Sequence, residues 1–195
     1  PAGSTFKPGL PYSFLVVSKT PDNNLVDTEI NTSITFMDKD FKNIKTETET
    51  QNTVKGKINV EINPPVDAVA ITINCSSQSA RTTKTIEAVY SPSGNFIHLE
   101  QTSEGTPQVG ENIKFWVYSS KEAINFYYEV ISHGSMIFSD YTQGSEITIR
   151  TTPAMAPSSR LLVYQILPNA EVAADYLPFK VTAQYPQNVK LELST

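Results

Sequence analysis

The sequence predicts an all-β chain made of two tandem antiparallel β-sandwiches, and three observations support this fold class. Nine Phe and nine Tyr accompany abundant Thr and Ser, and only 18% of the residues are charged. This composition suits half-buried strands better than helices. Short apolar segments recur between turn residues, with no window of long helical period. One apolar segment also returns about one domain length later.

That repeat joins residues 8–18 (PGLPYSFLVVS) to residues 109–119 (VGENIKFWVYS). Aligned without a gap, Gly9 matches Gly110, so the offset is 101 residues, 110 minus 9. An immunoglobulin-like sandwich has roughly 100 residues. The repeat therefore predicts two copies of one sandwich of immunoglobulin or fibronectin type III kind.

The predicted domains are residues 1–92 and 93–195, joined near the turn-forming segment 91–94 (SPSG). Residues 57–62 (KINVEI) alternate apolar and polar side chains, as a strand with one wet face does. The other predicted strands cover residues 12–18, 33–37, 66–73, 84–90, 96–101, 113–119, 125–132, 136–141, 146–151, 160–167, 177–183 and 189–193. The polar stretch 45–55 (KTETETQNTVK) fits a charged edge strand or a mobile loop equally well.

Charge and cysteine content exclude several classes of function. Residues 1–92 hold nine basic and ten acidic side chains, and residues 93–195 hold six and ten, so the halves carry −1 and −4. Neither half offers the basic footprint that nucleic acid or an anionic membrane requires. No apolar run reaches transmembrane length. The single Cys75 cannot form an internal disulfide or a multi-thiolate metal site, and we expect the chain to be excised from a longer one.

Catalytic chemistry is not expected, and no cofactor or metal site is predicted. The two histidines, His98 and His133, lack the spacing of a zinc helix, and no nucleophile elbow, dinucleotide or phosphate-loop motif occurs. His133 precedes Gly134 and is interpreted as a turn residue, whereas His98 is interpreted as a solvent-side strand residue. The aromatic groups at 115–118 and 126–128 are expected to pack in the core between two sheets.

Two sequons give the only candidate site residues, as acceptors of N-linked glycans. They are Asn31, in Asn-Thr-Ser, and Asn74, in Asn-Cys-Ser. Asn31 follows a polar stretch and is expected to be exposed. Asn74 fits a buried strand end equally well. Both can carry a glycan only if the chain crosses the secretory pathway.

Several motifs resemble the macroglobulin domains of thioester-containing proteins in the alpha-2-macroglobulin and complement superfamily. Residues 6–12 (FKPGLPY) resemble the opening of such a domain, and residues 125–134 (NFYYEVISHG) resemble a strand of the next one. Residues 155–164 (MAPSSRLLVY) and 167–175 (LPNAEVAAD) continue that likeness, with Ala170 in place of the usual turn glycine. Residues 187–194 resemble the first strand of a following domain.

The resemblance implies the fourth and fifth macroglobulin domains of a secreted or surface-anchored parent, which traps proteases or opsonises surfaces. These domains would be scaffold packed against neighbouring macroglobulin domains, with proteases or pathogen surfaces contacted through the parent. The thioester motif Gly-Cys-Gly-Glu-Gln does not occur in the chain, and the bait segment is expected elsewhere. The alternative is a free-standing fibronectin-like module for adhesion or partner binding.

Overall fold

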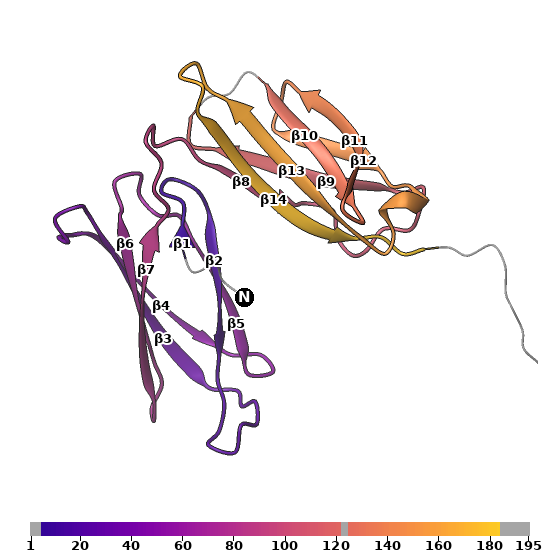
Figure 1. Ribbon diagram of the computed structural model, residues 1–195. Coiled ribbons are helices and arrows are strands. Elements are labelled where there is room, and N and C mark those ends of the chain that lie inside the picture. Colours follow the sequence, from indigo (N-terminus) through magenta and orange to yellow (C-terminus); the bar gives the residue numbers. More distant parts are fainter. Residues whose placement is uncertain (1–4, 122–124, 184–195) are drawn as a thin grey trace, which may run out of the picture. The chain divides into compact units, whose positions relative to one another are not determined.

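The computed structural model describes residues 5–121 and 125–183. These residues form β-strands and one short 3₁₀ turn, so the predicted all-β class is confirmed (Figure 1). The chain divides into two compact units, Pro1–Phe96 and Ile97–Thr195, four residues after the boundary expected from the sequence. No helix in the described ranges is long and apolar enough to cross a membrane.

The first unit packs a five-stranded sheet on a two-stranded one. The larger sheet has the order β1 (Thr5–Phe6), β7 (Arg81–Ala88), β6 (Ala70–Ser76), β3 (Glu29–Met37) and β4 (Asn43–Asn52), and the smaller pairs β2 (Tyr12–Val17) with β5 (Lys57–Ile62). All neighbours are antiparallel except β1 and β7. The alternation in β5 buries Ile58, Val60 and Ile62 in the same core cluster as Phe36 and Ile71 of the larger sheet.

The second unit is a sandwich of three and four strands. One sheet has the order β12 (Glu146–Arg150), β9 (Asn112–Ser119) and β8 (Ile97–Gln101), and the other β11 (Ser135–Thr142), β10 (Phe126–Ser132), β13 (Ser158–Ile166) and β14 (Val172–Lys180). A 3₁₀ turn, Pro153–Met155, precedes β13. Phe115 is fully buried and packs edge-on against Phe179, with the ring centres 5.5 Å apart.

The open alternative for the polar stretch 45–55 is resolved, because most of it belongs to β4. This strand lies at the edge of its sheet and pairs with β3 only among the described residues. Its side chains stay largely exposed on both faces. The charges of Lys45, Glu47 and Glu49 discourage pairing with another chain, as expected at a sheet edge.

Some predicted boundaries were wrong for identifiable reasons. β6 begins at Ala70 instead of at residue 66, because the Ala68 amide donates to Pro65 O in a turn. β14 begins at Val172 and runs through Pro178. A proline is tolerated in this strand because β14 lies at the edge of its sheet, where the missing amide hydrogen would face away from β13. The predicted strands at 189–193 and 187–194 lie outside the described residues.

Candidate functional site

The two sequons are paired with each other across neighbouring strands. Asn31 on β3 is opposite Ser76 on β6, and Ser33 is opposite Asn74. Between them Thr32 is opposite Cys75, and both of these side chains are buried. Each acceptor asparagine therefore lies beside the hydroxyl residue that completes the other sequon.

Both asparagines belong to a hydroxyl-rich outer surface of the first unit, which we call the threonine face. Because Ile30, Thr32, Ile34 and Phe36 point into the core, the alternate residues of β3 and their cross-strand partners point outward. For the central part of β3, from Asn31 to Thr35, these outward residues are Asn31, Ser33, Thr35, Thr46, Thr48, Thr50, Thr72, Asn74, Ser76, Arg81, Thr83 and Thr85. These twelve positions include one charged side chain, Arg81, and the exposed Glu29 continues the outward row at the start of β3.

Cross-strand hydrogen bonds hold both asparagine side chains in place. Thr50 Oγ1 donates to Asn31 Oδ1 at 2.5 Å, and Thr83 Oγ1 donates to Asn74 Oδ1 at 2.6 Å. In each case the amide oxygen is engaged, and the Nδ2 atom, to which a glycan attaches, is not part of that bond. Asn31 is exposed and Asn74 is half-buried, so the prediction for Asn31 is confirmed and Asn74 is not at a buried strand end.

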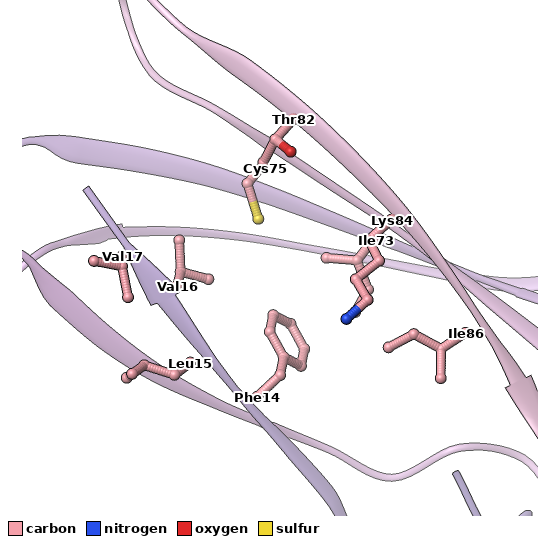
Figure 2. A pocket seen from close by; sticks show the side chains of 9 residues that line it. All are labelled: Phe14, Leu15, Val16, Val17, Ile73, Cys75, Thr82, Lys84 and Ile86. Atoms are coloured by element: carbon pink, nitrogen blue, oxygen red, sulfur yellow. The ribbon is translucent and has the colours of Figure 1, made fainter. Parts of the chain in front are cut away.

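A second feature of the first unit is an apolar groove along β2, which we call the β2 groove. It holds about 410 Å³ and is lined by Phe14, Leu15, Val16, Val17, Ile73, Cys75, Thr82, Lys84 and Ile86. Figure 2 shows Cys75 and Lys84 pointing from the larger sheet toward the side chains of β2. The groove is the gap between the edges of the two sheets, where β2 faces β7.

The two histidines take structural positions in the second unit. His133 and Gly134 form the turn between β10 and β11 with positive φ of 49° and 80°, which confirms the predicted turn. His98 alternates with the buried Ile97 and Leu99, which confirms the predicted solvent side of the strand, and its side chain is partly covered, with Nε2 3.3 Å from Glu100 and Nδ1 3.6 Å from Asp175. No three His, Cys, Asp or Glu side chains within 5–121 and 125–183 lie close enough to hold a metal ion.

The prediction that the aromatic groups fill the core was right for only half of their members. Phe115, Phe126 and Tyr128 are buried, whereas Trp116 and Tyr127 are 39% and 41% exposed. Consecutive strand residues point to opposite faces, so an unbroken aromatic run must divide between core and surface. On the outer face, Tyr127 stacks on Tyr164 with ring centres 5.6 Å apart.

Neither the threonine face nor the β2 groove was predicted from the sequence. The alternation of Thr with Glu at 46–50 (TETET) was a usable signal for a face of hydroxyl groups. The 101-residue repeat was a usable signal for the groove, because it invites a strand-by-strand comparison of the two units.

Comparison with known proteins places the chain in a family. The family model described as "Alpha-2-macroglobulin bait region domain" matches residues 97–195, which is 99 of 195 residues, or just over half of the chain. The chain belongs to the alpha-2-macroglobulin family. The match coincides with the second sandwich, so in this family member the bait region domain model corresponds to strands β8 to β14 and the residues that follow.

Two complement proteins extend the likeness over both units of this alpha-2-macroglobulin family member. Complement C3 of Eptatretus burgeri is 28% identical over 97% of the chain, and Complement C3 of Lethenteron camtschaticum is 24% identical over 96%. In each case the match covers 12% of the relative. The chain therefore spans about one eighth of the length of these relatives.

The family assignment also bears on Cys75. It lies in Asn-Cys-Ser on β6, is buried, and has its Sγ 3.8 Å from Thr32 Oγ1. The surrounding sequence is not the thioester motif expected of the superfamily. In this alpha-2-macroglobulin family chain, Cys75 is a packed side chain at the base of the β2 groove.

Proposed function

We propose that the chain is structural scaffold in a complement-like protein that acts outside the cell in innate immunity, through opsonisation or protease trapping. The observation that carries this proposal is the likeness to Complement C3 over 97% of the chain, joined to the bait region domain match. Neighbouring macroglobulin domains of the longer protein are the direct partners. Proteases or microbial surfaces are contacted through that protein as a whole.

The side chains support a scaffold instead of a catalyst. The large aromatic and branched residues fill two separate cores. His133 forms a turn and contacts Ala156 O at 3.1 Å, and His98 lies beside two carboxylates. Their positions account for both histidines without a role in catalysis or a need for a cofactor.

An extracellular location agrees with the threonine face. Both sequons lie on an outer surface rich in hydroxyl groups, where a glycan can extend into solvent. We therefore propose a secreted or surface-anchored parent.

The test is an immunoblot of the source organism's extracellular fluid with an antibody raised against this chain. A band several times larger than the 21.5 kDa chain, cut into discrete pieces by a small amount of added protease, supports the proposal. A second aliquot is incubated with microbial particles, and antigen that resists washing in denaturant indicates opsonisation. A band of the size of the chain itself, unchanged by protease, would leave a free-standing binding module.

A further inference from the structure

One edge of β2 has no strand beside it within the described residues. β2 pairs with β5 alone, and the Ser18 amide donates to Gly56 O at 2.9 Å. Successive amides of a strand point to opposite sides, so residues 14, 16 and 18 face β5. The amides of Leu15 and Val17 therefore point away from β5, toward the β2 groove.

The sequence repeat shows what occupies the same edge in the second unit. Adding the offset of 101 to Phe14 gives Phe115, so β9 is the counterpart of β2. β9 has β12 on one side and β8 on the other. β8 pairs with residues 115–119 of β9, which correspond to residues 14–18, the stretch that lines the β2 groove.

β8 also supplies the side chains that close the second sandwich at this edge. Ile97 and Leu99 are 1% and 2% exposed and belong to the core of the second unit. The Leu99 amide donates to Asp175 Oδ2 at 3.0 Å, which ties β8 to β14. In the first unit the same place is an apolar gap over Ile73, Cys75 and Ile86.

β1 does not fill that place. The Val89 amide donates to Phe6 O, and in the second unit the Thr182 amide donates to Pro107 O, both at 2.8 Å. β1 is thus the counterpart of the segment around Pro107, which follows β8. β8 ends at Gln101, six residues before Pro107. A counterpart of β8 in the first unit would therefore end about six residues before Phe6, which is next to Pro1.

We propose that the open edge of β2 accepts one extended segment as an added antiparallel strand, and that this segment is the half dozen residues directly preceding Pro1 in the longer protein. The relatives are about eight times as long as the chain, and the proposal requires that part of the longer protein lies before Pro1. Main-chain bonds to Leu15 and Val17 fix the strand, as in other cases of strand addition. Two apolar side chains, separated by one residue, fill the β2 groove. This inference concerns the first unit and does not depend on the scaffold role.

The experiment compares the 195-residue chain with the same chain extended by the ten residues that naturally precede Pro1. Hydrogen exchange of the Leu15 and Val17 amides should slow by at least about tenfold in the extended chain, because each gains a hydrogen bond and buried surroundings. Labelling of the Cys75 thiol by a maleimide should slow as well, since the added side chains cover it. Equal exchange and equal labelling in the two chains would overturn the proposal.

A pair of variants of the extended chain separates main-chain pairing from side-chain packing. Leu15→Pro removes the outward amide without removing a bond to β5, so it should restore fast labelling of Cys75. Leu15→Ala removes the side chain and keeps the amide, so labelling should stay slow. Should the proline variant not fold, the exchange comparison still decides. A second copy of the chain is the other possible occupant of the groove. If the Leu15 and Val17 amides of the 195-residue chain exchange more slowly as its concentration rises, and sedimentation shows a dimer, a second copy fills the groove and the proposed segment does not.

Discussion

Asn31 and Ser76 face each other across β3 and β6, so two glycosylation sequons lie antiparallel and in register. The two acceptor asparagines are diagonal neighbours on one face, which places their Cα atoms roughly 7–8 Å apart. A glycan on either asparagine therefore covers much of the surface from which the other would extend.

The first prediction is that secretion from a glycosylating cell yields mainly one glycan per chain, on Asn31. This side chain is exposed, whereas Asn74 is half-buried between β3 and β7. Mass spectrometry of glycopeptides before and after enzymatic deglycosylation measures the occupancy of each site. Asn31→Gln should raise occupancy at Asn74, and Asn74→Gln should leave Asn31 unchanged. A population dominated by doubly glycosylated chains would contradict the prediction.

The second prediction concerns the core of the second unit. Phe115 is fully buried against Phe179, so Phe115→Ala should lower the free energy of unfolding by about 3–5 kcal/mol. Trp116→Ala, one residue along β9 on the exposed face, is the matched control and should cost less than about 1 kcal/mol. Urea unfolding followed by circular dichroism measures both. Equal losses for the two variants would show that burial does not decide the effect.

The third prediction uses a strained alanine. Ala170 has φ of 64° in the turn between β13 and β14, and its amide donates to Leu167 O at 2.9 Å. A side chain in this region is strained, and glycine is not. Ala170→Gly should therefore stabilise the second unit by about 0.5–1 kcal/mol, after allowance for the freer unfolded chain.

Its control is Ala80→Gly, in the first unit at an alanine without positive φ. That change should destabilise or have no effect, because glycine there only adds freedom to the unfolded chain. Thermal unfolding of both variants beside the parent chain distinguishes the cases. A lower midpoint for Ala170→Gly would show that the turn does not hold strain.

The sequence was sufficient to predict strands with one apolar and one solvent-exposed face, and insufficient to predict strand segments that carry polar residues on both faces. Residues 57–62 alternate cleanly, and the predicted strand coincides with β5. The start of β3 was missed because Asn31 is outward and polar while the inward Thr32 is a hydroxyl residue that contacts Cys75. Hydrophobic periodicity carries no information where the inward position is itself polar.

The candidate site shows the same limit. Sequons can be found from three residues, so Asn31 and Asn74 were predicted individually. Their pairing depends on the antiparallel register of β3 and β6, in which Thr32 lies opposite Cys75, 43 residues later in the chain, 75 minus 32. Sequence-local rules do not reach that distance, whereas the repeat of Phe14 and Phe115 did indicate which strands of the two units correspond.

The last prediction is a loss of stability in alkali. Burial raises the pKa of Tyr128 above its usual value, and the negative charge of Asp140 raises it further. Above about pH 10 the unfolded chain releases the phenolic proton while the folded chain keeps it. The unfolded state then binds fewer protons, so the free energy of unfolding falls as the pH rises from the ordinary tyrosine pKa toward the raised one. Below that window this contribution is fully present.

Trp116, the single tryptophan, lies in the second unit and reports its unfolding without interference from the first. Urea titrations followed by its fluorescence at about pH 8 and about pH 11 should show a smaller alkaline loss for Tyr128→Phe than for the parent chain. Tyr90→Phe, which changes a ring that is 86% exposed in the first unit, should not reduce the loss. If Tyr128→Phe loses as much stability in alkali as the parent, the folded and unfolded states bind the phenolic proton equally, and the buried hydroxyl does not control the alkaline limit of this sandwich.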